Sequence, residues 1–207
     1  TSLTRLGIFS SQISEVSPLT NLTNLTNLVL EHNQLTDLSG LSKLTKLTGL
    51  YLANNQITDV SPLANLDSLT LLHLSENQLT DLSELSNLTN LRYLALYSNQ
   101  LSDIFPLANL TKLTNLSLHN NQITDITTLL ENTGISGTIN LKGNPLSNTA
   151  YASHIPTLKA RGITVEYDEP PTGTVTFKDA NLEKAIRDAL GIPTELLKKE
   201  DLEKLTN

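Results

Sequence analysis

Leucines recur along most of the chain in a pattern that repeats every 22 residues. Each repeat carries the same phrase: leucine, two variable residues, leucine, one variable residue, leucine, two variable residues, asparagine, one variable residue and an aliphatic residue. The asparagines of five consecutive repeats are Asn33, Asn55, Asn77, Asn99 and Asn121. Ser11 holds the same place before this series and Asn144 follows it after one inserted residue, so seven repeats are visible.

A second aliphatic set follows in each repeat, for example Val60, Leu63 and Leu66, so about seven side chains per repeat point inward. Burying seven such side chains cannot offset the entropy lost in ordering 22 backbone residues. A single repeat therefore stays unfolded, and stacked repeats share one aliphatic core. The alternation from Leu50 to Leu52 predicts a short strand, and strands so close in sequence predict a parallel sheet wound as a coil.

Two polar columns accompany the leucines, and both are predicted to be structural. A buried asparagine amide can donate to and accept from backbone groups where each coil turns away from the sheet. An aspartate four residues after each asparagine is expected to cap a turn on the outer side. Calcium binding is disfavoured because one carboxylate per repeat lacks the clustered ligands that calcium needs. These aspartates are Asp37, Asp59, Asp81, Asp103 and Asp125.

The repeat pattern ends at Pro145, and the array is assigned to residues 1–147. A helix is predicted at 148–160, with Tyr151, Ile155 and Leu158 on one side, and Gly162 ends it. A strand is predicted over 163–167. Residues 148–168 are thus expected to form a lid that covers the apolar end of the last repeat.

Residues 169–174 form a linker by composition, and 175–207 begin a different pattern. Asp179 can cap a helix with an apolar spacing from Leu182 to Leu190, and Gly191 stops it. A further helix is predicted from Glu195 to Leu205.

These segments carry a family resemblance. The repeats, for example "LTNLRYLALYSNQLSDIFPLAN" at 88–109, resemble the 22-residue bacterial leucine-rich repeats of the internalin group, and the resemblance spans Leu3 to Leu146. "GNPLSNTAYASHIPTLKARGITVEYD" at 143–168 is similar to the C-terminal lids of related proteins. The tail at 175–207 resembles the helical cap that normally precedes such an array.

The resemblance implies an α/β fold: a right-handed leucine-rich-repeat solenoid, or horseshoe, with a short parallel sheet on its concave face, a helix-strand lid and a small helical segment at the C-terminus. It also implies a non-catalytic binding protein, extracellular or on a bacterial surface, whose partners are proteins of a host or a cell surface. No enzymatic activity and no cofactor are expected.

Composition narrows the partners further. The net charge of −7 disfavours nucleic acid. Cysteine is absent, which excludes disulfides, thiolate metal sites and cysteine nucleophiles. No run of about 18 apolar residues predicts a membrane span, and the first ten residues do not resemble a signal peptide.

The variable residues between the leucines of each strand face the concave side, where packing leaves them free to vary. Aromatic side chains gather there, and they are predicted to bind another protein or a glycan. The alternative is that aromatic packing between repeats stabilises the sheet. The two histidines of this set would lie about 10 Å apart, so a shared zinc ion is not expected. The candidate ligand-binding residues are Phe9, Glu31, Tyr51, His73, Tyr93, Tyr97 and His119.

A second hypothesis is self-assembly, because the first repeat has no cap and the cap-like segment lies at the opposite end of the chain. One subunit's tail could close the open repeat of the next, which would give a homo-oligomer or filament. Alternatively, the chain is one period of a tandem polypeptide, or a fragment trimmed from a larger multi-array protein. The candidate assembly residues are Leu3, Leu6, Ile8, Leu182, Ile186, Leu190, Leu202 and Leu205.

Overall fold

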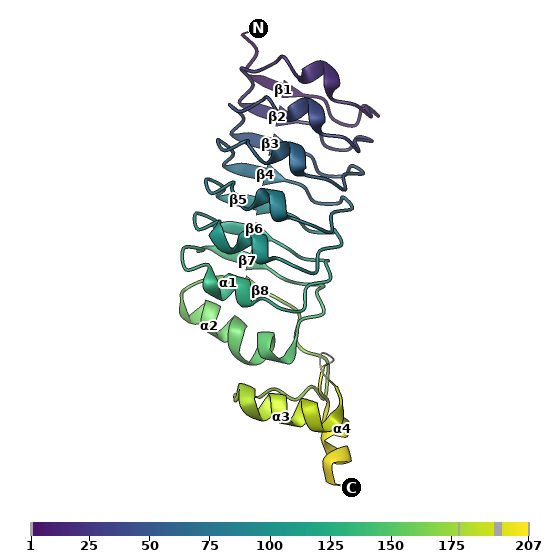
Figure 1. The fold of residues 1–207 in the computed structure, drawn as a ribbon, viewed down its shortest axis with the longest axis vertical. Helices are drawn as coiled ribbons and strands as arrows, with labels where there is room; N and C mark the ends of the chain where they lie inside the picture. Colours follow the sequence, from purple (N-terminus) through teal and green to yellow (C-terminus); the bar gives the residue numbers. More distant parts are fainter. Residues whose placement is uncertain (1, 178, 193–195, 207) are drawn as a thin grey trace.

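The structure is a computed structural model that describes residues 2–177, 179–192 and 196–206. Eight strands form a single parallel sheet in which each strand pairs with the next one along the chain (Figure 1). This order is that of a continuous coil, and it confirms the predicted leucine-rich-repeat solenoid. The strands are β1 (Arg5–Gly7), β2 (Asn27–Val29), β3 (Gly49–Tyr51), β4 (Leu71–His73), β5 (Tyr93–Ala95), β6 (Asn115–Ser117), β7 (Thr138–Asn140) and β8 (Thr164–Glu166).

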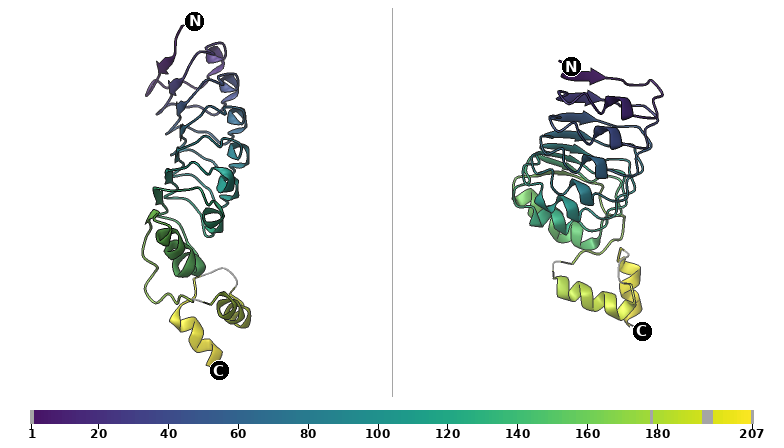
Figure 2. Two further views of the ribbon diagram at one scale, coloured as in Figure 1. Left: turned by 90° about the vertical axis from the view of Figure 1, so that its left-hand side faces the viewer. Right: turned by 45° about the horizontal axis from the view of Figure 1, so that its top comes forward.

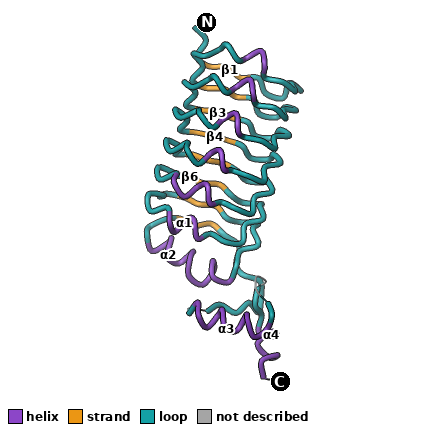
Figure 3. The backbone as a smooth tube through the Cα atoms, viewed as in Figure 1, coloured by secondary structure: helices purple, strands orange, loops and turns teal. Residues whose placement is uncertain are grey.

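Short helical turns lie on the side of the coil opposite the sheet, as Figures 2 and 3 show. Strand residues such as Leu28, Leu50 and Leu72 pair in register and are fully buried. Together with the aliphatic residues of the turns they form one continuous core along the array. The turns are η1 (Ser17–Leu19), η2 (Ser39–Leu41), η3 (Ser61–Leu63), η4 (Ser83–Leu85), η5 (Phe105–Asn109) and α1 (Thr127–Glu131).

The asparagine column is a buried hydrogen-bonding ladder, as predicted. Asn77 donates from Nδ2 to the carbonyls of Leu52 and Leu74 at 3.0 Å each, and its Oδ1 accepts from the Ile57 amide at 3.0 Å. Leu52 and Ile57 belong to the preceding rung, so each amide joins two rungs. The same arrangement repeats along the array at Asn33, Asn55, Asn99, Asn121 and Asn144.

The aspartate column caps the outer turns, also as predicted. Asp81 accepts hydrogen bonds from the amide of Ser83 at 2.9 Å and from its hydroxyl at 2.7 Å. These bonds favour the ionised carboxylate, so they lower the pKa of Asp81 below its usual value. The same geometry lowers the pKa of Asp37, which accepts from Ser39.

In each rung, the residue immediately before the position of the ladder asparagine adopts a left-handed backbone that the repeat pattern did not predict. Non-glycine residues are uncommon in this region because Cβ crowds the backbone. The last repeat has Gly143 here, with φ of 67°, which relieves that crowding. The residues with φ between 54° and 56° are His32, Asn54, Glu76, Ser98 and Asn120.

The segment predicted as a lid packs against the end of the array. Its helix contains a π-helical turn, η6 (Ala150–His154), followed by α2 (Ile155–Ala160), and β8 extends the sheet beside β7. Arg161 ties the lid to the last turn of α1, because its guanidinium donates to the carbonyls of Leu130 at 3.1 Å and Asn132 at 2.8 Å. Ile155 and Leu158 are buried, as the predicted helix face requires.

The tail begins with α3 (Ala180–Leu190), which starts at an Asp179 cap and ends at Gly191 with φ of 66°, as predicted. The second predicted helix is wrong at its start. Leu196 to Lys198 is not helical: the Val175 amide bonds to the Leu197 carbonyl at 2.8 Å, and Leu197 is fully buried. This contact with a distant segment overrides the local helical spacing.

The remaining helical elements of the tail are α4 (Lys199–Glu203) and η7 (Lys204–Thr206). The predicted starting residue, Glu195, lies outside the described residues. The tail contacts the lid through hydrogen bonds from Asn148 to the Val175 carbonyl and from Thr149 to Glu183.

Candidate functional site

The outward face of the parallel sheet, called here the concave face, carries three columns of side chains. They occupy the positions before, between and after the two leucines of each strand phrase, so every strand contributes one residue to each column. Because the leucines are locked into the core, the outward positions are held on a rigid support. The face lies opposite the helical turns (Figure 2).

Four of the predicted binding residues come together at the middle of this face. The ring of Tyr97 stacks on that of His119, with centroids 4.4 Å apart and planes 12° from parallel. Tyr97 also contacts His73, whose ring is tilted relative to that of Tyr97, and the two ring centroids lie 5.8 Å apart. His73 Nδ1 in turn lies 2.8 Å from a carboxylate oxygen of Glu31. We call Glu31, His73, Tyr97 and His119 the central cluster.

The pairing of Glu31 with His73 was not predicted, because the two residues lie two rungs apart. Ala53 occupies the intervening rung in the same column as Glu31, and its small side chain leaves room for the two to meet. Although Ala53 points outward, it is only 5% exposed. A small residue flanked by larger ones in one column is the sequence signal that could have indicated this contact.

Two other small residues on the concave face, Ser75 and Ala95, are also fully buried. Outward-facing residues lose their exposure in this way only when neighbouring side chains cover them. The aromatic rings therefore pack between rungs, as the alternative explanation for the aromatic columns requires. Tyr93 keeps 37% of its surface exposed and Tyr51 is half-buried, so the face still presents aromatic surface to solvent.

Phe9 lies at the first rung, outside the central cluster, and is 65% exposed. Its ring lies beside Gly7 of the same rung, where a Cβ atom would be in ordinary contact with it at 3.9 Å. The structure thus assembles four of the seven candidates into one contact network and places Phe9, Tyr51 and Tyr93 around it on the same face.

The central cluster sits in a negative and partly dehydrated environment. Burial raises the pKa of Tyr97, and the nearby charges of Glu76 and Glu31 raise it further. Burial lowers the pKa of His119, which favours its neutral form. The three columns from β2 to β6 contain no lysine or arginine. This part of the face therefore presents aromatic and imidazole rings edged by carboxylates.

Tyr97 stands between the two histidines, and no three His, Cys, Asp or Glu side chains among the described residues gather in a metal-binding arrangement. Among those residues there is also no helix with the length and apolar character that crossing a membrane requires.

The predicted assembly residues lie at opposite ends of the long axis (Figure 1). Leu3 is 41% exposed at the first rung, where Leu6 and Ile8 are half-buried. In the tail, Leu182 is 52% exposed and Leu205 is 42% exposed. Ile186, Leu190 and Leu202 are half-buried.

Comparison with known proteins agrees with this geometry. A family model described as leucine-rich repeats in two copies matches residues 1–43, 45–87 and 89–131. No curated protein sequence matches the chain. Two solved structures from Listeria monocytogenes are similar. The first is an internalin (inlF) with a TM-score of 0.72 and 36% sequence identity; the match covers 81% of this chain and 50% of the inlF chain. The second is internalin C2, with a TM-score of 0.62 and 32% sequence identity; the match covers 79% of this chain and 80% of the internalin C2 chain.

A leucine-rich-repeat protein of Leptospira interrogans is also similar, with a TM-score of 0.66 and 32% identity over 76% of this chain and 40% of its own. The chain thus spans about half the length of the inlF structure and most of internalin C2. Repeat proteins of this kind generally bind other proteins and do not catalyse reactions. The sheet, the ladder and these matches agree: the chain belongs to the leucine-rich-repeat proteins, in their internalin-like bacterial group.

Proposed function

We propose that the chain binds a partner protein through the concave face, with Tyr51, Tyr93 and the central cluster at the middle of the contact. The observation that carries this proposal is a stacked group of aromatic side chains on the outward face of a rigid sheet. Tyrosine supplies a large contact area and a polar tip at low entropic cost, which is why it is frequent at the centres of protein interfaces.

The charges of the face favour a partner that presents lysine or arginine. Glu31 and Glu76 flank the rings, and the central columns carry no lysine or arginine that would repel a basic side chain. A guanidinium or ammonium placed over Tyr97 or Tyr93 would gain a cation–π interaction and the attraction of these carboxylates. Binding is accordingly expected to weaken as salt concentration rises.

The test begins with a displayed library of constrained random loops, selected against the immobilised chain. We expect enrichment of loops that contain Lys or Arg, and at least a tenfold loss of their affinity for the double variant Tyr51→Ala, Tyr93→Ala. These two positions are chosen because Tyr97 also packs within the fold. Phe105→Ala is the control, since it removes an exposed ring from the helical turn η5 rather than from the sheet. Loops that bind the double variant as tightly as the parent chain would refute the proposal.

A second candidate function is head-to-tail self-assembly. Exposed leucines at both ends of the long axis favour it, because Leu182 and Leu205 of one subunit could cover Leu3 of the next. Such a heterologous contact propagates into filaments when it does not close into a ring. With either function we place the protein outside the cell or on a bacterial surface, a proposal supported by its likeness to the internalins.

Light scattering and electron microscopy on the chain with and without residues 169–207 test the assembly. We expect larger particles only when the tail is present, and we expect Leu182→Glu to reduce their size. Monomers in both samples over a wide range of concentrations would contradict self-assembly and leave the concave-face proposal intact.

A further inference from the structure

Phe105 departs from the repeat on the side of the solenoid away from the sheet. The equivalent residue in the neighbouring rung is Ser83, whose hydroxyl donates to Asp81 at 2.7 Å. Phe105 retains the backbone bond from its amide to Asp103, at 2.8 Å, but it has no hydroxyl to add the second bond. The other rungs carry Ser17, Ser39, Ser61 and Thr127 at this position.

The phenylalanine gives the fold little in return for the lost hydrogen bond. It is 65% exposed, whereas Leu107 of the same turn is fully buried. A ring left mostly in water contributes little hydrophobic stabilisation. Since the five other rungs show that a hydroxyl residue suits this turn, the ring is explained better by a ligand than by folding.

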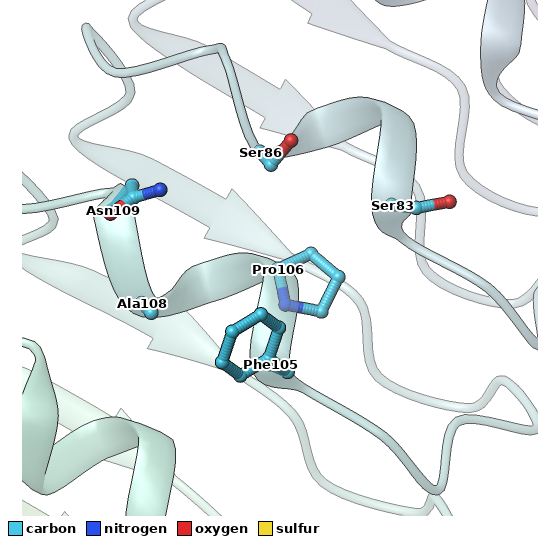
Figure 4. A pocket seen from close by; sticks show the side chains of 6 residues that line it. All are labelled: Ser83, Ser86, Phe105, Pro106, Ala108 and Asn109. Carbon is cyan, nitrogen blue, oxygen red and sulfur yellow. The ribbon is translucent and has the colours of Figure 1, made fainter.

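The ring forms one wall of a pocket between η4 and η5. The pocket has a volume of about 220 Å³, and Figure 4 shows the Phe105 and Pro106 rings side by side, with Ser86 and Asn109 at its edge. The Ser83 hydroxyl at the far side is directed to Asp81 and is already engaged. The lining residues are Ser83, Ser86, Phe105, Pro106, Ala108 and Asn109, and none of them is charged.

This lining restricts the chemistry of the ligand. An ionic ligand would lose hydration without meeting an opposite charge among the lining residues. A purely apolar side chain would fit the rings but would leave the Ser86 hydroxyl and the Asn109 amide without a polar match. A ligand with one flat apolar face and several neutral hydroxyls satisfies both kinds of wall, because a hydroxyl and a carboxamide each donate and accept hydrogen bonds.

We propose that this pocket is a subsite for one neutral pyranose residue of a glycan. The C–H face of the sugar ring lies on Phe105, with Pro106 beside it, and its hydroxyls bond to Ser86 and Asn109. The volume is below the range of about 300–1,000 Å³ typical of pockets for drug-sized molecules, and it suits a single ring that continues into solvent. The subsite is independent of the concave face, so both faces can be occupied together.

The experiment is an NMR titration of the isotopically labelled full chain with methyl glycosides of glucose, galactose, mannose and N-acetylglucosamine. At least one of them is expected to cause saturable shifts, confined to residues of η4 and η5, with a millimolar Kd. Phe105→Ser should weaken that binding at least tenfold. The variant should fold normally because serine stands at this position in four of the other rungs. Phe9→Ser is the matched control, since Phe9 is also 65% exposed but lies on the concave face, and it should leave the shifts unchanged.

Three results would overturn the proposal. The first is the absence of saturable shifts with all four sugars at tens of millimolar. The second is binding that persists in the Phe105→Ser variant. The third is saturation of the pocket by N-acetyl-leucine amide while the sugars fail to bind, which would assign it to an apolar peptide side chain.

Discussion

Replacing Asn77 by alanine should destabilise the array far more than its modest change in volume suggests. This side chain is only 8% exposed and contacts four backbone groups. Two of these groups, the Leu52 carbonyl and the Ile57 amide, belong to the preceding rung. Alanine would leave the Ile57 amide without the acceptor that satisfies it, at a depth that water does not reach freely, whereas the Leu52 carbonyl would keep its bond from Asn55 at 3.0 Å.

The magnitude follows from the number of groups left unpaired. A buried donor or acceptor without a partner costs about 1–3 kcal/mol, so the unpaired Ile57 amide of the preceding rung costs about 1–3 kcal/mol. A domain of ordinary stability unfolds with a free energy of about 5–15 kcal/mol. The substitution should therefore remove a measurable part of the stability of the array.

Urea unfolding followed by far-UV circular dichroism measures the effect, and circular dichroism is preferred because the chain has no tryptophan. The matched control is Asn65→Ala, which changes an exposed asparagine and should shift the free energy of unfolding by less than about 0.5 kcal/mol. If Asn77→Ala and Asn65→Ala unfold at the same urea concentration, the ladder is not the stabilising element inferred from its geometry.

Three further predictions concern other parts of the chain. Gly40→Ala should lower the urea midpoint, since a Cβ there would lie 2.4 Å from a backbone carbonyl oxygen of the preceding rung, whereas Gly7→Ala should not. Ser83→Ala should raise the pKa of Asp81 towards its usual 3.8, as measured by an NMR titration. Because the pKa of Asp81 is lowered in the folded chain, its carboxylate stabilises the fold above pH 3.8, and this stabilisation is lost as the pH falls through the folded-state pKa. Leu197→Ala should cost about 2–5 kcal/mol of local stability, seen as faster amide hydrogen exchange in the tail.

The periodic part of the structure could be predicted because each position meets the same neighbours in every rung. A leucine such as Leu72 faces the equivalent leucines above and below it, so repetition alone fixes its burial and its strand register. The asparagine ladder and the aspartate caps follow for the same reason: an amide or a carboxylate at a fixed offset from the strand repeatedly meets the same backbone groups.

The parts that could not be predicted depend on contacts between different residue types or distant segments. Nothing in the side chain of Glu76 signals its left-handed backbone, which the turn before the ladder asparagine imposes. The Leu196–Lys198 segment has helical spacing, yet it pairs with the chain near Val175. The contact between Glu31 and His73 required the small Ala53 between them, a property of one column read across three rungs.

Repetition also supplies an internal standard for identifying binding residues. On the concave face, part of the aromatic surface is used by the fold itself, because Tyr97 packs against His73 and His119, and outward-facing residues such as Ser75 and Ala95 are fully buried. At Phe105 the comparison is sharper: the other rungs show which residue type stabilises the turn, and the departure both loses a hydrogen bond and leaves a ring exposed. An exposed ring in place of serine lowers the stability of the turn unless a ligand covers the ring. The single substitution Phe105→Ser therefore tests ligand binding more directly than any substitution on the sheet.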